Sequence, residues 1–299
     1  RAPGRRRGGG VLVLRDVPGA AEACRAAARR GSLGLVPTMG ALHAGHAALV
    51  RRARAESDTV AVSIFVNPLQ FDDDADLQRY PRTEEADADL LAAEGCDLLL
   101  LLPREGMYPP GFATRIDQPA LSGLLEGAAR PGHFAGVLTV VAKLLVLASP
   151  ARAYFGRKDF QQTVLVRRLV ADLGLPLEVV VCDTVRDADG LALSSRNVFL
   201  SPADRQRGLS LVRALAAVEA AFEAGQRDGA VLGELLQATL RAGLSGPPDY
   251  ATLVDPDDLS PRAVARTGDV AVVAARVGPV RLIDNHVLGG RIGPLAPRS

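Results

Sequence analysis

The sequence has little cysteine, almost no net charge and no long hydrophobic run, and each shortage excludes a class of protein. Its 299 residues include three cysteines, Cys24, Cys96 and Cys182, without any Cys-x-x-Cys spacing. Neither a disulfide framework nor a cysteine zinc site is therefore expected, and we interpret the cysteines as small buried hydrophobic residues in a reducing cytoplasm. A formal net charge of +1 gives no field that would attract nucleic acid or an anionic membrane.

A membrane span is not expected, because no run of about eighteen apolar residues is present. The longest candidate, residues 137–147, is too short and contains Lys143. Residues 11–14 are too short for the hydrophobic core of a signal peptide. Residues 1–10 contain four arginines and four glycines, and a disordered basic tail is favoured there over a phosphate-binding arm.

The sequence does contain a regular alternation of short apolar strands with helices. Continuously apolar strands separated by helices are typical of a parallel sheet, so we predict an α/β fold: a Rossmann-like parallel sheet with helices on both faces. The predicted strands lie at residues 11–14, 33–36, 59–66, 97–102, 153–155 and 177–181. The predicted helices lie at 18–30, 46–54, 83–94, 137–148 and 161–173, with one short helix near 121–125.

The pattern changes after residues 194–197, which predicts a smaller C-terminal α+β domain that starts near residue 187. Two alanine- and leucine-rich helices are followed there by short strands. We place the helices at 203–224 and 229–242 and the strands at 250–254, 270–275 and 281–284. The predicted segments are a tail at 1–10, domains at 11–186 and 187–290, and a second tail at 291–299.

The first candidate site lies where the strand at 33–36 turns into the next helix. Pro37 and Gly40 should end the strand, since proline has no N–H for the ladder and glycine permits unusual backbone angles. His43 and His46 can then reach one ligand and donate to phosphate oxygens, while Gly45 allows a close approach at a helix N-terminus. Zinc is a weaker alternative because no third ligand lies nearby. Capping of the helix by both histidines also stays open, as the less favoured alternative.

A second polar cluster follows the strand at 153–155. Lys158 is suited to neutralise a phosphate, and Asp159 is suited to accept from ribose hydroxyls. Gln162 is expected on the first turn of the following helix. Charged loops between strands and helices are common, so this cluster alone is weak evidence.

A third polar cluster contains Ser194, Ser195 and Arg196. Hydroxyl groups beside an arginine suit a mobile phosphate clamp, since arginine adds charge-assisted hydrogen bonds. Taken singly, the stretch is better interpreted as a solvated turn in which Ser194 caps a short helix. The three clusters together indicate a bound nucleoside triphosphate.

Six motifs occur in order along the chain. They are Pro37-Thr38-Met39-Gly40-Ala41-Leu42-His43-x-Gly45-His46; Ser63-Ile64-Phe65-Val66-Asn67-Pro68-x-Gln70-Phe71; Tyr80-Pro81-Arg82-Thr83; His133-Phe134-x-Gly136-Val137; Phe155-Gly156-x-Lys158-Asp159-x-Gln161-Gln162; and Asp189-Gly190-Leu191-Ala192-x-Ser194-Ser195-Arg196-Asn197. In this order and spacing, from about residue 11 to 285, the chain resembles the pantoate–β-alanine ligase family, also called pantothenate synthetases. The His-x-Gly-His motif alone is shared with many nucleotidylyltransferases and class I tRNA synthetases, whereas the ordered set is specific.

The resemblance implies a reaction in which (R)-pantoate and β-alanine condense to pantothenate at the expense of ATP. A pantoyl adenylate would be the intermediate, and AMP and diphosphate would be released. The resemblance also implies a magnesium ion and a homodimer in the cytoplasm. The expected partners are the small-molecule substrates pantoate, β-alanine and ATP, with no nucleic acid and no membrane.

Carried over by position, the resemblance implies that His46 is a catalytic proton donor. His43, Lys158 and Arg196 would help to neutralise the departing diphosphate, and how the two histidines divide the work stays open. The residues implied to hold ATP are Met39, Gly40, Ala41, Leu42, His43, Ala44, Gly45, His46, Gly156, Arg157, Lys158, Asp159, Val185, Leu193, Ser194, Ser195 and Arg196.

The same resemblance implies that Gln70 and Gln162 hold pantoate and that Gln70 also contacts β-alanine. Asp87 is the acidic residue that aligns with the family's metal position. Arg157 stands where the family usually has glutamate, which reverses a charge beside Lys158. Two rival functions stay open: a nucleotidylyltransferase that keeps AMP on its product, and a nucleotide-sensing or RNA-binding relative without turnover.

Overall fold

The computed structural model describes residues 5–7, 10–71 and 74–292, and it divides the chain into two compact units. The first unit holds the described residues up to Gly123, together with Arg130–Gly156 and Leu165–Asp183. The second holds Leu124–Ala129, Arg157–Val164 and the described residues from Thr184 onward. The final division, at 183/184, falls near the 186/187 boundary expected from the sequence, and the two short inserted segments have no counterpart in that expectation.

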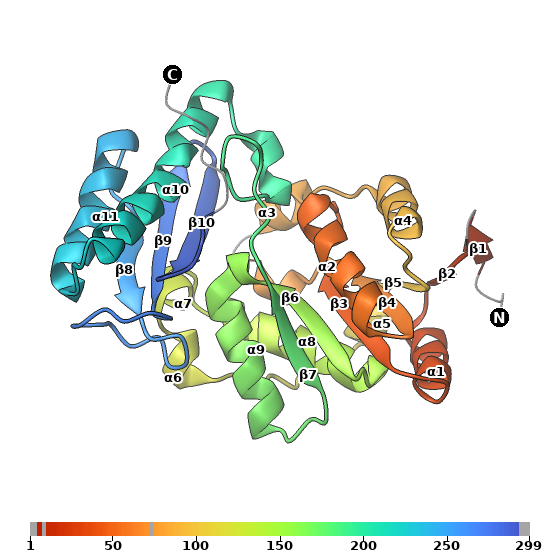
Figure 1. Cartoon of the computed structure of the whole chain (residues 1–299). Helices are drawn as coiled ribbons and strands as arrows, with labels where there is room; N and C mark the ends of the chain where they lie inside the picture. The colour runs from red at the N-terminus through yellow and green to blue at the C-terminus, as the bar shows by residue number, and fades with distance from the viewer. Residues whose placement is uncertain (1–4, 8–9, 72–73, 293–299) are drawn as a thin grey trace. The chain divides into compact units, whose positions relative to one another are not determined.

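The first unit is built on a seven-stranded sheet (Figure 1). The strands from β2 to β7 follow the order β2-β5-β4-β3-β6-β7, and each pair of neighbouring strands is parallel. This arrangement confirms the predicted α/β class. The strands are β1 (Arg5–Arg7), β2 (Val11–Leu14), β3 (Leu33–Thr38), β4 (Thr59–Ile64), β5 (Leu98–Leu101), β6 (Arg152–Gly156) and β7 (Glu178–Cys182).

Helices cover the sheet because consecutive strand residues are buried on opposite faces. Val36 and Val62 belong to one apolar cluster with Leu49 and Leu91 of two helices, while their neighbours Leu35 and Ala61 are also fully buried. The longer helices are α1 (Val17–Ala28), α2 (Ala44–Glu56), α4 (Glu84–Ala93), α8 (His133–Ala148) and α9 (Phe160–Asp172). Shorter ones are η1 (Pro68–Gln70), α3 (Asp74–Arg79), α5 (Arg104–Met107), α6 (Pro119–Ser122), α7 (Leu125–Ala129) and η2 (Arg157–Asp159).

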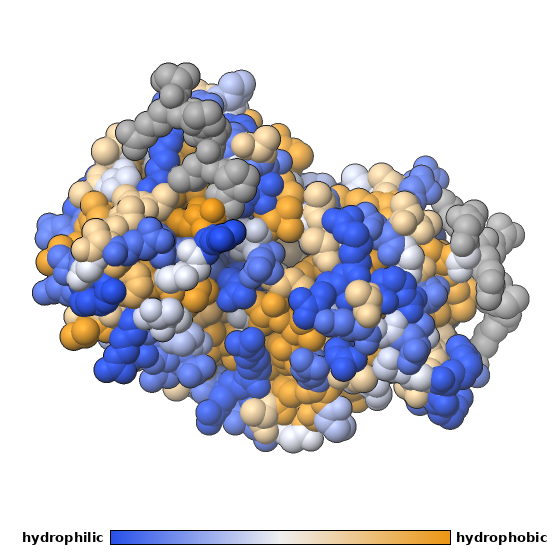
Figure 2. All heavy atoms as spheres, in the orientation of Figure 1, coloured by the Kyte–Doolittle hydropathy of each residue, from blue (hydrophilic) through white to orange (hydrophobic). Residues whose placement is uncertain are grey.

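The outer side of α2 is polar. Hydrophilic residues gather over this helix in Figure 2. The side chains of its Arg51 and Arg52 are 57% and 52% exposed. Cys24 and Cys96 are buried as predicted, and desolvation raises the pKa of Cys24 to about 11 and that of Cys96 to about 12. Cys182 is only half-buried.

Two predictions about the sheet are wrong. Arg5–Arg7 form β1, antiparallel to β2, rather than a disordered tail; residues 1–4 and 8–9 of that predicted tail lie outside the described residues. The pairing gives partners to the backbone groups that β2 would otherwise leave open at the sheet edge. Pro37 does not end β3, which continues to Thr38. At that level β6 no longer pairs with β3, so no neighbour on that side needs the N–H that proline lacks.

The second unit has the predicted α+β character. Its antiparallel sheet has the order β10-β9-β8 and packs with two helices around a core that includes Leu215, Leu236 and Val273. The elements are η3 (Ser195–Phe199), α10 (Pro202–Glu223), α11 (Gly229–Gly243), β8 (Tyr250–Val254), β9 (Val270–Val277) and β10 (Val280–Val287). Of the predicted tail at 291–299, residues 293–299 lie outside the described residues. In neither unit does a described helix combine the length and apolarity needed to cross a bilayer.

Candidate active site

The first candidate site follows β3, next to the point where the order of the strands in the sheet reverses. The order β5-β4-β3-β6-β7 reverses between β3 and β6, so the carboxyl ends of these strands, at Thr38 and Gly156, flank the reversal. Open α/β sheets bind ligands outside the carboxyl ends of strands at such a position. The histidine motif begins there, directly after β3.

The turn between β3 and α2 has an unusual backbone that Asp87 holds in place. Gly40 and Ala41 both lie in the left-handed region, with φ of 82° and 51°, and alanine rarely adopts this conformation. The Asp87 carboxylate accepts from the backbone N–H of Ala41 at 2.9 Å and of Leu42 at 2.8 Å. It also accepts from the Thr83 hydroxyl at 3.0 Å, so Thr83 begins α4 without capping it through its side chain.

His43 and His46 cap the N-terminus of α2 reciprocally. The Nδ1 atom of His43 accepts from the backbone N–H of Gly45 at 3.1 Å, and Nδ1 of His46 accepts from the backbone N–H of His43 at 3.3 Å. A backbone N–H can only donate, so each Nδ1 must be an unprotonated acceptor. In the neutral ring the proton then sits on Nε2, which the cap does not use.

These contacts join two interpretations that the sequence treated as alternatives. The capping interpretation, which the sequence disfavoured, is confirmed. It does not exclude a ligand, because the cap uses one nitrogen of each ring and orients the other as an N–H donor. The ring centroids lie 4.2 Å apart, so two Nε2–H donors are presented from one turn.

The surroundings of Asp87 do not fit a metal site. Asp87 is 3% exposed, and its two carboxylate oxygens accept three hydrogen bonds from protein donors. Within the part of the chain that the structure describes, no three His, Cys, Asp or Glu side chains are grouped so that they could hold a metal ion. Asp87 therefore anchors the turn before α2, which differs from the metal-ligand role implied by the resemblance.

We expect Asp87→Asn to lower the melting temperature and to weaken ATP binding. The amide NH2 would replace one carboxylate oxygen and face the backbone N–H that this oxygen accepts from, which removes about one charge-assisted bond worth about 1.5 kcal/mol. Thermal unfolding and the KM for ATP check the effect on the turn. A magnesium titration provides the contrast, since a lost metal ligand would raise the half-saturating magnesium concentration while the melting temperature stayed constant.

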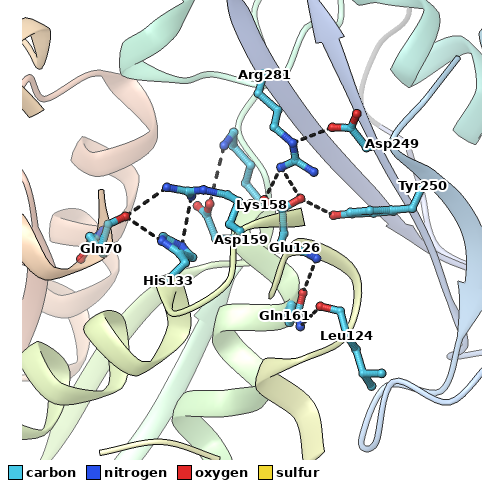
Figure 3. Close-up of polar contacts among 11 residues, drawn as sticks. Gln70, Leu124, Glu126, His133, Lys158, Asp159, Gln161, Asp249, Tyr250 and Arg281 are labelled. Atoms are coloured by element: carbon cyan, nitrogen blue, oxygen red, sulfur yellow. Dashed lines mark hydrogen bonds and ion pairs between the residues drawn. The ribbon is translucent and has the colours of Figure 1, made fainter. Parts of the chain in front are cut away.

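Gln70 lies at the end of η1 and is fixed at both its backbone and its side chain. Its carbonyl oxygen accepts from Arg130 Nη2 at 3.0 Å and from His133 Nδ1 at 2.8 Å, as Figure 3 shows for Gln70 and His133. Its amide oxygen accepts from Asn67 Nδ2 at 2.9 Å, and its Nε2 lies 3.1 Å from the Met39 sulfur. The first and second motifs, predicted to bind ATP and pantoate, are therefore brought into contact.

Gly136 of α8 allows the helix to approach η1. A Cβ at this position would overlap the Leu69 carbonyl and would lie 2.9 Å from the Gln70 nitrogen. The Gly136 carbonyl in turn accepts from Asn67 Nδ2 at 3.1 Å. The motif that contains His133 and Gly136 thus acts through Gln70, a role that spacing along the sequence did not reveal.

In the second unit, Arg157, Lys158 and Asp159 form η2. Asn285 of β10 donates through Nδ2 to the carbonyls of Arg157 and Lys158, each at 2.9 Å, and so fixes this turn. Lys158 Nζ lies 3.8 Å from the Asp159 carboxylate. Gln162 is half-buried at the start of α9, in the first turn as predicted.

The loop that carries Ser194 is held by hydrogen bonds within the second unit. Ser194 caps η3 by accepting from the Arg196 N–H at 3.3 Å, which confirms the structural interpretation of this stretch. Leu193 donates its N–H to the Val185 carbonyl at 3.0 Å, so these two predicted ATP residues lie side by side. Although burial opposes it, hydrogen bonds from Arg205 and Leu191 lower the pKa of Asp189, which keeps the loop's acidic anchor ionised.

Lys158 and Ser194 line one small cavity in this unit. Its volume of about 20 Å³ is enough for a water molecule and far too small for a nucleotide. Among the other lining residues are Arg281 and Asp284 of β10. The predicted second and third clusters thus meet within the second unit.

Sequence reasoning missed an ionic group around the buried Glu126. Figure 3 shows Arg281 between Glu126 and Asp249, with the Tyr250 hydroxyl donating to Glu126 at 2.8 Å. Gln161 accepts from the Glu126 N–H at 3.0 Å, which ties α7 to α9. Burial, reinforced by the Glu126 charge, raises the pKa of Tyr250 and keeps its hydroxyl protonated. Of these residues, a motif had pointed only to Gln161.

Comparisons with known proteins show extensive similarity. Residues 13–287 match the family model described as pantoate-beta-alanine ligase. Pantothenate synthetase from Roseiflexus sp. (strain RS-1) is 52% identical over 262 residues, which cover 88% of this chain and 94% of the relative. The enzyme of the same name from Chloroflexus aggregans is 50% identical over 269 residues, covering 90% of this chain and 97% of the relative.

Solved structures agree with these matches. The crystal structure of pantothenate synthetase from Thermus thermophilus superposes with a TM-score of 0.87 at 48% identity, covering 92% of this chain and 98% of that chain. Pantoate-beta-alanine ligase from Francisella tularensis, complexed with "Beta-gamma ATP" and β-alanine, gives a TM-score of 0.76 at 33% identity, covering 93% and 97% of the two chains.

Proposed function

The chain belongs to the pantoate–β-alanine ligase family, and from that premise we propose that it joins pantoate to β-alanine through a pantoyl adenylate, with ATP as the energy source. The observation that carries this mechanism is the pair of histidines at the end of β3, each with Nδ1 held by a backbone N–H. Two oriented Nε2–H donors at a helix N-terminus suit the phosphate groups of a nucleotide.

The first step is attack of a pantoate carboxylate oxygen on the α-phosphorus of ATP, which breaks the bond to diphosphate. A carboxylate is already ionised at pH 7, so this step needs alignment and charge neutralisation rather than a strong base. In the second step, the β-alanine amine attacks the acyl carbon, an amide bond forms, and AMP leaves with the bonding electrons. The amine proton goes to solvent or to AMP.

The first unit contributes the residues that we propose hold the reacting groups. His46 and His43 donate from Nε2 to phosphate oxygens and stabilise the charge that develops on diphosphate. Gln70 binds pantoate and meets β-alanine, and its fixed backbone and amide support a defined orientation. The remaining proposed ATP contacts in this unit are Met39, Gly40, Ala41, Leu42, Ala44, Gly45 and Gly156.

The second unit contributes cationic and polar groups to the proposed chemistry. Lys158 and Arg196 neutralise phosphate charge, and Gln162 holds pantoate. Closure of the loop that carries Ser194, Ser195 and Arg196 would keep water from the activated intermediate. Arg157, Asp159, Val185 and Leu193 complete the proposed ATP contacts.

We further propose that ATP reacts as its magnesium complex and that the protein works as a cytoplasmic homodimer, proposals that rest on the family resemblance. The metal would be carried on the phosphate oxygens, since Asp87 already holds three protein donors. Magnesium would then supply neutralisation of phosphate charge during attack on the α-phosphorus.

The test uses the purified chain with ATP, pantoate and β-alanine supplied one at a time and together. We expect diphosphate release with pantoate and ATP alone, limited to about one equivalent of enzyme, and continuous AMP and pantothenate formation once β-alanine is added. Product mass separates the rival nucleotidylyltransferase, which would keep AMP on its product. Release of AMP without pantoate, or with another acid in its place, contradicts the proposed substrates.

A further inference from the structure

The amide of Gln70 is reached by a chain of hydrogen bonds whose direction is determined by backbone groups. Asn67, which is fully buried, faces the N–H of Leu69 at 3.2 Å with one end of its amide and the carbonyl of Gly136 at 3.1 Å with the other. A backbone N–H only donates and a carbonyl only accepts. Asn67 must therefore present Oδ1 to Leu69 and Nδ2 to Gly136.

This orientation determines the contacts on both sides of Asn67. Asn67 Nδ2 also lies 2.9 Å from the Gln70 amide, so that atom of Gln70 must be the acceptor Oε1. Asn67 Oδ1 lies 2.8 Å from the hydroxyl of Tyr108, which must therefore donate. The hydrogen bonds run in one direction, from Tyr108 through Asn67 to Gln70.

The donor end of Gln70 is consequently left for a ligand. Its Nε2 is 3.1 Å from the Met39 sulfur, and a thioether is a weak acceptor that a ligand oxygen can replace at little cost. We propose that Tyr108 is a positioning residue: its hydroxyl holds Asn67 in the orientation that the backbone determines, in which Gln70 presents N–H rather than C=O to an oxygen of pantoate. This inference rests on the proposed function, since it assumes that Gln70 binds pantoate.

The surroundings of Tyr108 suit such a role. Its ring packs edge-on against Phe65 at a centroid distance of 5.6 Å and lies 4.9 Å from the ring of Phe112. Burial raises the pKa of Tyr108, so its hydroxyl keeps the proton that it donates. Tyr108→Phe would leave the ring packing intact and remove the first donor of the chain.

We expect Tyr108→Phe to raise the KM for pantoate about fivefold to tenfold, the size of one lost hydrogen bond. The KM for ATP and the kcat should change less than about twofold. Tyr154→Phe is the matched control, because it removes a buried hydroxyl of the same unit that contacts Ser57 instead. Equal rises in the KM for pantoate in both variants would overturn the inference.

A double-mutant cycle separates positioning from general damage. In a Gln70→Ala background, Tyr108→Phe should have no further effect on the KM for pantoate; additive effects would overturn the inference. Gln70→Glu tests the direction of the bond, since glutamate keeps the acceptors and has no N–H. It should weaken pantoate binding at least as much as Gln70→Ala, and retained binding would show that Oε1 faces the ligand. Failure of the proposed function would appear separately, as a wild-type enzyme that forms no pantothenate.

Discussion

Replacing His46 with asparagine is expected to lower the rate of adenylate formation at least about a hundredfold, while the melting temperature stays nearly unchanged. The asparagine amide oxygen occupies the place of Nδ1 and can still accept from the His43 N–H, so the helix cap survives. The Nε2–H donor is lost. Single-turnover formation of diphosphate from ATP and pantoate measures the rate, and thermal unfolding measures the cap.

His46→Gln is the matched variant, because its amide reaches the place of Nε2 and leaves Nδ1 without a substitute. It should retain more of the rate than His46→Asn and should lose about 1 kcal/mol of helix-capping stability. The same pair of substitutions at His43, whose Nδ1 caps Gly45, shows how the two histidines divide the work. A normal single-turnover rate in His46→Asn would remove His46 from the chemistry and leave it as a cap only.

Gly136→Ala is expected to raise the KM for pantoate at least about tenfold and to lower the melting temperature by about 5 °C. The new methyl group would overlap the Leu69 carbonyl and crowd the Gln70 nitrogen, so α8 and η1 would have to separate. That shift breaks the bond from Asn67 to the Gly136 carbonyl and moves the amide of Gln70. Because the obstacle is backbone, no rotamer change relieves it.

Gly233→Ala provides the control for Gly136→Ala. Gly233 also lies within a helix, α11, but a Cβ there would have no atom within 4 Å. This substitution should stabilise the helix by up to about 1 kcal/mol and leave both KM values unchanged. Steady-state kinetics measures the KM values of the two variants, and thermal unfolding measures their melting temperatures. An unchanged KM for pantoate in Gly136→Ala would show that the position of η1 does not affect pantoate binding.

The sheet and its flanking helices were largely predictable, because their signals are local. Continuous apolar runs at 59–66 and 97–102 mark strands that are covered on both faces, and they correspond to β4 and β5. The exceptions depended on neighbours distant in sequence. Arg5–Arg7 form a strand because β2 offers an open edge, and Pro37 is tolerated in β3 because β6 has separated from it there.

In the candidate site, too, some features were predictable from the sequence and others depended on tertiary contacts. The order and spacing of its motifs are properties of the chain alone, and they identified the family and the stretch from Met39 to His46. The proton positions are not. Nδ1 of both histidines is an acceptor because each faces a backbone N–H at the start of α2. The turn that precedes them has a left-handed backbone held by Asp87, 46 residues from Ala41.

By itself, then, the sequence determined the fold class, the family and which polar side chains follow which strands, because each depends on local periodicity or on motif spacing. Only the tertiary structure determined what those side chains present to a ligand. The direction of the Gln70 amide depends on the Gly136 carbonyl, 69 residues from Asn67, and Tyr108, 41 residues from Asn67, donates to the Asn67 amide that this carbonyl orients. Hydrogen bonds across such separations have no signature in periodicity, since they exist only once β4, η1 and α8 have packed.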